Sequence, residues 1–205
     1  VEFAKNYNVV LEVMSSFEVK PGTLVREENK QMEQMIIRGI AADKNQAKVT
    51  LLSVPDTPGV AAKIFKALGN AKVNVDMIVQ NVSAAGVTDI SFTVAKDDLN
   101  KTKRVVEPLV RDIRATGANF SDDLAKVSLV GVGMKSHSGV AFKMFDVLAA
   151  NKINIEMIST SEIKLSVVIL AKDTDRAVRA LHEAFGMGVR ARQAKAAPKK
   201  KTARR

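Results

Sequence analysis

One stretch organises this chain: Asp56–Asn81, which reads DTPGVAAKIFKALGNAKVNVDMIVQN. It recurs 80 residues later as SHSGVAFKMFDVLAANKINIEMISTS, and no gap is needed to align the two copies. Ten aligned pairs are identical, including Gly59 with Gly139 and Asn74 with Asn154. The run AKVTLL just before the first copy, at 47–52, also recurs, as AKVSLV at 125–130. A repeat of this size indicates a duplicated structural unit, so the chain is read as two modules.

The apolar pattern of the first copy predicts two helices and four strands. Apolar residues at helical spacing after Gly59 indicate a helix, and runs rich in β-branched residues indicate strands. The expected elements are a strand over 47–54, a helix over 59–69, strands over 73–82 and 88–95, a helix over 97–115 and a strand over 118–121. Asp56 or Thr57 is expected to cap the first helix, and Pro108 to kink or shorten the second. This βαββαβ order is ferredoxin-like and belongs to the α+β class.

The second copy repeats this order but lacks its last strand. Its expected elements are a strand over 125–132, a helix over 139–150, strands over 153–160 and 165–171, and a helix over 173–185. A further strand is expected over 35–41, ahead of the first copy, followed by a turn at 43–46. A sheet edge without its strand leaves backbone groups unpaired. We therefore expect 35–41 to complete the second sheet, which inserts the first module within the second.

Composition limits the class of protein. The 205 residues include no Cys, which excludes disulfides and thiol nucleophiles and suits a cytoplasmic protein. No apolar run approaches the roughly 20 residues that a membrane-spanning helix needs, and the N-terminus does not resemble a signal peptide. The chain starts at Val1 in the middle of a pattern, as a fragment of a longer protein would.

The net charge of +10 is concentrated at the C-terminus. Residues 190–205 contain eight basic residues and no acidic ones, and the remaining chain is nearly neutral. Such an Ala, Lys, Arg and Pro segment is typical of a disordered, solvated tail. A weak contact with a polyanion is the alternative interpretation.

Catalytic motifs are mostly absent from the sequence. His137 and His182 are 45 residues apart and no Cys accompanies them, which argues against a zinc site. The run GVGMKS at 131–136 has Met134 where a phosphate-binding loop needs glycine before its lysine, and it is too short. One Tyr and no Trp leave little for a base to stack on, which weakens an RNA-binding reading. No cofactor and no metal are expected.

Small and polar residues gather at the start of the first helix and along the next strand. They are Asp56, Gly59, Ala61, Asn74, Asp76, Gln80 and Asn81. Free N–H groups at a helix start favour a carboxylate, and Asp56 or Asp76 offers a partner for an ammonium, so this set suits a free amino acid. The alternative is purely structural: Gly59 and Asn74 serve turns and Asp56 caps the helix.

These residues also carry a family resemblance. The sequence Asp56-x-Pro58-Gly59, then Asn74-x-Asp76-Met77-Ile78, Gln80-Asn81 and TDISF at 88–92, resembles the ACT modules of aspartokinase. The second copy is similar through KVSLVGVGMKSH at 126–137 and NIEMISTSEI at 154–163. The lead-in is similar as well, through VEFA at 1–4, SSF at 15–17 and GTLV at 22–25, so the resemblance covers about 1–187.

The resemblance implies a feedback-control region of the enzyme that phosphorylates aspartate. It divides the chain into a linker remnant at 1–34 after an absent kinase domain, a first ACT module at 35–123, a second at 124–187 and a disordered basic tail at 188–205. This chain alone is then not expected to transfer phosphate. The implied partners are threonine and/or lysine as effectors, a catalytic chain or domain of aspartokinase, and further copies that form a homodimer or heterotetramer by ACT pairing. A membrane is not expected as a partner, and nucleic acid is not favoured.

The resemblance also implies two sets of effector-binding residues. The threonine-like set is Asp56, Gly59, Ala61, Asn74, Gln80, Asn154 and Ile155. The lysine-like set is Asp76, His137, Gly139, Val140, Ser161 and Glu162. Lys152 stands where relatives often have Asn, and Ser138 replaces a usual Pro, which leaves the effector itself open.

Three other functions stay open at the level of sequence. An ACT-bearing DNA regulator would need a helix-turn-helix, which the pattern does not show. A ferredoxin-like nucleic-acid binder would depend on the basic tail. An ACT-type module that serves only dimerisation would respond to no effector.

Overall fold

The computed structural model describes residues 3–4, 7, 9–18, 20–25, 37–81, 86–131 and 139–187. The chain divides into two compact units, Val1–Ile36 and Ile37–Arg205. In the first unit, β1 (Leu11–Val13) and β2 (Thr23–Val25) form an antiparallel pair in which Leu11 is opposite Val25. The Gly22 N–H donates to the Glu12 carboxylate over 3.0 Å, which closes this hairpin.

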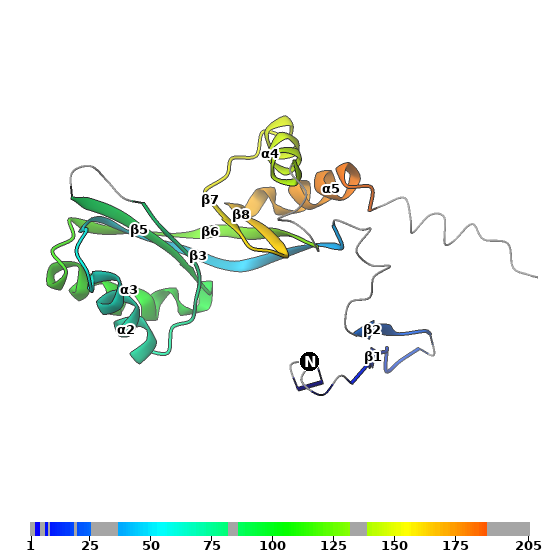
Figure 1. The fold of residues 1–205 in the computed structure, drawn as a ribbon, viewed down its shortest axis with the longest axis horizontal. Helices are drawn as coiled ribbons and strands as arrows, with labels where there is room; N and C mark the ends of the chain where they lie inside the picture. Colours follow the sequence, from blue (N-terminus) through cyan, green and yellow to red (C-terminus); the bar gives the residue numbers. More distant parts are fainter. Residues whose placement is uncertain are drawn as a thin grey trace, which may run out of the picture. The chain divides into compact units, whose positions relative to one another are not determined.

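The second unit is built on one antiparallel sheet of six strands, in the order β4-β5-β3-β6-β8-β7 (Figure 1). The strands are β3 (Gly39–Pro55), β4 (Val75–Gln80), β5 (Val87–Val94), β6 (Gly117–Val130), β7 (Met157–Thr160) and β8 (Lys164–Leu170). The α-helices are α2 (Val60–Asn70), α3 (Leu99–Asp112), α4 (Val140–Ala150) and α5 (Thr174–Ala184). Short 3-10 turns, η2 (Lys96–Asp98) and η3 (Ala171–Asp173), lead into α3 and α5.

Two long strands at the centre, β3 and β6, belong to both copies. The end of β3 pairs with β5 and with the start of β6, where Val49 is opposite Phe92 and Phe120. The start of β3 pairs with the end of β6, from Gly39 opposite Val130 to Asp43 opposite Lys126. The first copy thus has the strand order β4-β5-β3-β6 and the second the order β7-β8-β6-β3. The segment before the first copy supplies the missing strand, which confirms that the first module is inserted in the second.

The turn expected at 43–46 is wrong, because β3 runs through these residues as one strand of 17 residues. The polar run produces register shifts against β6 between Asp43 and Gln46 and again between Gln46 and Lys48. The chain bulges here and does not reverse, since the same neighbour, β6, offers pairing partners on both sides. For the same reason the two strands expected over 118–121 and 125–132 are a single strand, β6.

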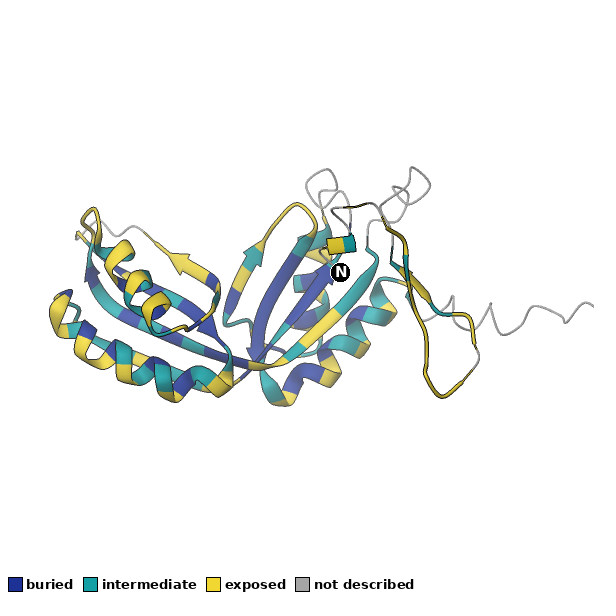
Figure 2. Cartoon of the chain, turned by 90° about the horizontal axis from the view of Figure 1, so that it is seen from below, coloured by how far each residue is buried: buried dark blue, intermediate teal, exposed yellow. Residues whose placement is uncertain are grey.

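Each copy has its own core between the sheet and its two helices. In the first copy, fully buried Leu51 and Phe92 of the sheet meet Ile64 and Leu68 of α2. In the second, Leu129 of the sheet meets Met144 and Leu148 of α4 and Leu181 of α5. Figure 2 shows the buried positions along the sheet and the inner helix faces, with exposed positions on the outer helix faces. The apolar face of each helix therefore packs on the sheet, as the amphipathic pattern predicted.

Two local expectations for the first copy need correction. No side chain caps α2: the N-cap position falls on Gly59, which has none, so Asp56 and Thr57 do not act as its cap. Pro108 lies inside α3, and the helix continues to Asp112. Because Pro108 is on the exposed side of α3, the backbone carbonyl that its ring leaves unpaired can face water.

Candidate functional site

The candidate site begins with the turn that joins β3 to α2. Gly59 has a φ of 94°, a left-handed value that favours glycine, and it directs the chain from the turn into the helix. The Asp56 N–H donates to the Gly86 carbonyl over 2.9 Å, which ties the turn to the start of β5. The Val60 N–H donates to the Thr57 carbonyl over 3.4 Å. Because no side chain caps α2, the N–H groups that follow in its first turn and the positive end of its dipole are available to an anion.

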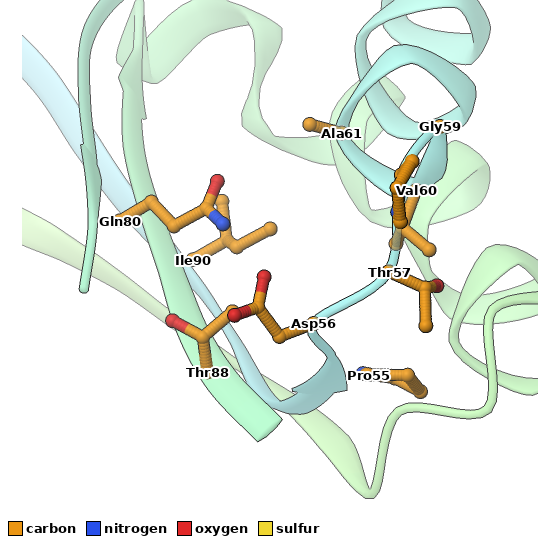
Figure 3. Close-up of a pocket in the computed structure, with 10 residues that line it drawn as sticks. Pro55, Asp56, Thr57, Gly59, Val60, Ala61, Gln80, Thr88 and Ile90 are labelled. Atoms are coloured by element: carbon orange, nitrogen blue, oxygen red, sulfur yellow. The ribbon is translucent and has the colours of Figure 1, made fainter. Parts of the chain in front are cut away.

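A cavity of about 310 Å³ lies beside this turn. Its lining residues are Pro55, Asp56, Thr57, Pro58, Gly59, Val60, Ala61, Gln80, Thr88 and Ile90. Figure 3 shows the Asp56 carboxylate and the Gln80 amide extending toward the same space, with Val60 and Ala61 of α2 across from them. The volume is at the lower end of the range for small-molecule sites.

The chemistry of the lining suits a small zwitterion. The start of α2 offers positive potential for a carboxylate, and the Asp56 carboxylate offers a negative partner for an ammonium. The Gln80 amide can donate or accept a hydrogen bond, and Val60 and Ile90 provide apolar contact for a short side chain.

The structure brings four of the seven residues of the threonine-like set into this cavity: Asp56, Gly59, Ala61 and Gln80. Asn74 is exposed just before β4 and is not in the lining. Asn154 and Ile155 belong to the second copy. The Asn154 amide donates to the Glu156 carboxylate over 3.4 Å, and Ile155 packs on the second core.

Thr88 and Ile90 are lining residues to which sequence reasoning gave no role. Both lie on β5, are nearly fully buried and are two residues apart, so they share a face of the strand. The Thr88 hydroxyl donates to the Asn81 carbonyl, which links the ends of β4 and β5 beside the cavity. The spacing of two residues between Thr88 and Ile90 in the TDISF motif is the sequence feature that could have predicted that both lie on the same side of the strand.

The lysine-like set is dispersed, with all of its members except Asp76 in the second copy. Gly139 has a φ of 102° and begins α4 with Val140, as Gly59 and Val60 begin α2. Ser161 and Glu162 lie in the β7–β8 turn, where the Ser161 N–H donates to the Lys164 carbonyl over 2.7 Å. His137 lies outside the described residues.

Asp76 belongs to the first copy, and its carboxylate accepts a hydrogen bond from the Lys126 ammonium of the second copy.

Lys152 has a left-handed backbone conformation, unlike the helical residues before it. It follows α4 with a φ of 54°, and the equivalent Lys72 follows α2 with the same φ. Asn tolerates this left-handed region better than most residues. A lysine at this position therefore carries backbone strain at the end of α4.

Among the described residues, three carboxylates have lowered pKa values. The hydrogen bond from the Lys48 ammonium holds the pKa of the Glu156 carboxyl below its ordinary value of 4.5. Partial burial acts to raise the pKa of Asp43, but hydrogen bonds from Asn45 and Gln46, together with Lys126, outweigh burial and lower it. The Lys44 ammonium lowers the pKa of Asp175 in the first turn of α5. All three therefore stay ionised at neutral pH.

Among the residues that the structure describes, no three His, Cys, Asp or Glu side chains are grouped to hold a metal ion. Within the same part of the chain, no helix combines the length and apolar character needed to cross a bilayer.

A family model for the ACT domain matches the chain twice, over 52–108 and 127–185. The aspartate kinase of Pseudomonas fluorescens is 52% identical over 194 residues, which is 94% of this chain and 47% of that protein. The regulatory subunit of aspartate kinase from Thermus thermophilus, in its ligand-free form, is 42% identical with a TM-score of 0.70, over 73% of this chain and 99% of that one. The chain belongs to the family of aspartokinase regulatory regions built from two ACT domains.

The chain spans about half the length of the curated relatives that it matches. A further structural relative is Escherichia coli aspartokinase III in complex with lysine and aspartate, with 25% identity and a TM-score of 0.68 over 89% of this chain and 40% of that one. Both ACT domains of the present chain carry the glycine-started helix, at Gly59 and Gly139.

Proposed function

We propose that this chain is the allosteric, amino-acid-binding region of an aspartate kinase and mediates feedback inhibition by threonine and/or lysine. The observation that carries the proposal is the cavity beside Gly59, where an uncapped helix start and the Asp56 carboxylate provide opposite charges for the two ends of a free amino acid. The lysine complex of E. coli aspartokinase III supports an amino acid as the ligand class.

In this proposal, the threonine-like effector occupies the cavity of the first copy and is held by Asp56, Gly59, Ala61 and Gln80. The remaining members of that set, Asn74, Asn154 and Ile155, would act on the ligand from outside the cavity lining. The lysine-like effector is assigned to the second copy, at Gly139, Val140, Ser161 and Glu162. We extend that assignment to His137 and Asp76 on the resemblance alone.

We further propose that 35–123 and 124–187 are the two ACT modules, with 35–41 completing the sheet of the second, preceded by a linker at 1–34 and followed by a basic tail at 188–205. Catalysis is assigned to a kinase domain or chain outside this sequence. The edge strands β4 and β7 expose Ile78 and Ile158 at equivalent positions, which suits pairing with a second copy. Through such pairing, a ligand that binds one arrangement of the modules more tightly would favour one conformation of the partner kinase. The coupling free energy would be about 1–3 kcal/mol.

Thermal unfolding with a panel of amino acids tests the effector. Threonine or lysine should raise the melting temperature, because binding to the folded state alone stabilises it by about 2.7 kcal/mol at a hundredfold excess over Kd. Valine, which replaces the threonine hydroxyl by a methyl group, and norleucine, which lacks the lysine ammonium, are the matched control ligands. A response that is equal for every amino acid, or absent for all at millimolar concentration, contradicts the proposal.

A further inference from the structure

Two ion pairs cross between the copies in a reciprocal way. The Lys48 ammonium of the first copy is 2.7 Å from the Glu156 carboxylate of the second, and the Lys126 ammonium of the second copy binds the Asp76 carboxylate of the first. Lys48 aligns with Lys126 in the repeat, and Asp76 aligns with Glu156. The duplication therefore placed the same contact twice, and each time between the copies.

Both lysines lie on the face of the sheet that the helices leave uncovered. Lys48 alternates along β3 with Ala47 and Val49, which point into the first core. Lys126 alternates with Val127 in the same way on β6. Only 20% of the Lys48 side chain and 13% of the Lys126 side chain are exposed, against 29% of Glu156 and 41% of Asp76, so the lysines are largely shielded from solvent while the Asp76 carboxylate is more open to it. The Lys126 ammonium also lies 3.9 Å from the Asp43 carboxylate.

A small apolar cluster accompanies the crossed pairs. Met77 and Met157, which are equivalent in the repeat, pack with Leu124 and Val168. Val168 alternates on β8 with Val167 and Ile169 of the second core, so this cluster lies on the helix-free face. The edge strands β4 and β7 approach one another here, although they are at opposite ends of the strand order.

Each acid lies next to residues of a candidate effector site. Asp76 is on β4, the strand that ends in Gln80 at the cavity of the first copy. Glu156 immediately precedes β7 and accepts a hydrogen bond from the Asn154 amide. A lysine that holds one of these acids therefore also restrains the strand that carries site residues of the other copy.

We infer that Lys48 and Lys126 are positioning residues that couple the two ACT modules, each holding the ligand-bearing edge strand of the opposite module. Lys48 restrains β7, and Lys126 restrains β4. A change at one site then alters the order of the edge strand at the other through these two contacts and the methionine cluster between them.

Hydrogen exchange of the whole chain, read by mass spectrometry, tests this without any ligand. The variant Lys48→Met should accelerate exchange about fivefold over 153–160 in the opposite copy and leave 73–80 unchanged, and Lys126→Met should do the reverse. Lys96→Met is the matched control, because Lys96 is an exposed partner of Asp122 at 3.8 Å, and it should change neither segment.

The charge-exchanged variant Lys48→Glu with Glu156→Lys should restore the protection of 153–160. If the single lysine variants do not fold, Glu156→Gln and Asp76→Asn ask the same question, with faster exchange expected at 153–160 and at 73–80, respectively. Faster exchange confined to the substituted lysine's own copy, or unchanged exchange in both segments, overturns the inference.

The transmission of ligand binding rests on the proposed function and is measured separately. In the unmodified chain, saturating threonine should slow exchange at 73–80 and also over β7 at 157–160, which carries no residue of the threonine-like set, and Lys48→Met should abolish only the second effect. Absence of any threonine effect in the unmodified chain counts against the proposed effector, while the ligand-free comparison still decides the coupling. A threonine effect over 157–160 that survives in Lys48→Met together with Lys126→Met overturns the coupling.

Discussion

Gly59 and Gly139 are equivalent residues of the two copies, and both begin a helix with left-handed backbone, at φ values of 94° and 102°. A Cβ at either position would meet no atom within 4 Å, so space does not explain the glycine. The conformation does, because it strains any residue with a Cβ by about 1–2 kcal/mol. The same turn leaves the helix start uncapped and accessible to a ligand.

Gly59→Asp should abolish the threonine response. The new carboxylate would lie at the positive helix start and repel the carboxylate of the ligand. Gly59→Asn is the matched control, because it has the same size and the same backbone strain without the charge, and it should keep a threonine-dependent rise in melting temperature. Equal loss of the response in both variants would show that backbone strain, and not charge, is responsible.

Arg114→Gly should stabilise the chain by about 0.5–1 kcal/mol. Arg114 ends α3 with a φ of 59°, and the equivalent residue after α5, Gly186, has a φ of 67°. In both copies the next N–H donates back into the helix, from Ala115 to Val110 and from Met187 to His182, which is a Schellman end that favours glycine. Urea unfolding measures the gain.

The reverse substitution, Gly186→Arg, is the control for Arg114→Gly. It should destabilise the chain by a similar amount, about 0.5–1 kcal/mol, because a Cβ there meets no neighbouring atom and only the backbone is strained. Effects of the same sign in both variants would refute the explanation from the left-handed conformation.

Leu68→Ala and Leu148→Ala should each destabilise the unit by about 2–5 kcal/mol. The two leucines are equivalent, and both are fully buried between their helix and the sheet. Because β3 and β6 are shared by both sheets, each variant should still unfold in one cooperative transition in urea, at a lower midpoint. Two separate transitions would mean that the copies unfold independently despite their common strands.

The Lys48–Glu156 pair should contribute to stability only while Glu156 is ionised. Its folded pKa lies below the ordinary value of 4.5, so the contribution is present above that value and is lost as pH falls through the folded pKa. At pH 7, Glu156→Gln should therefore melt at a lower temperature than the unmodified chain, by the equivalent of about 1–2 kcal/mol.

This difference between Glu156→Gln and the unmodified chain should close as the pH falls below 4.5 and through the folded pKa of Glu156. The comparison isolates Glu156 from other acids, because Asp43 and Asp175 titrate in both proteins. A difference that stays constant over this range would show that Gln disturbs packing and that the charge contributes nothing.

Much of the local structure follows from sequence alone. The spacing of Val60, Ile64 and Leu68 predicted α2, and the repeat at 80 residues predicted the equivalent α4. These patterns depend on residues that are close in sequence, so they can be recognised without knowledge of the tertiary structure. The prediction that the first module lies within the second came from counting strands, since the second copy was one short.

The residues that line the candidate cavity were predicted only in part. Asp56, Gly59 and Ala61 are neighbours in the chain, whereas Thr88 joins them through pairing of β5 with β3 across the sheet. The bulge at 43–46 was missed because its residues are typical of a turn, and the strand continues only where β6 is present to pair with it.

The sequence by itself determined that a small βαββαβ unit occurs twice and that each copy has a glycine at its first helix, because these features depend on local periodicity and on repetition. The tertiary structure alone decided that β3 and β6 serve both sheets and that Lys48 and Lys126 bind acids of the opposite copy. Such contacts join residues 50 and 108 positions apart. Only the long-range register of the strands brings them together.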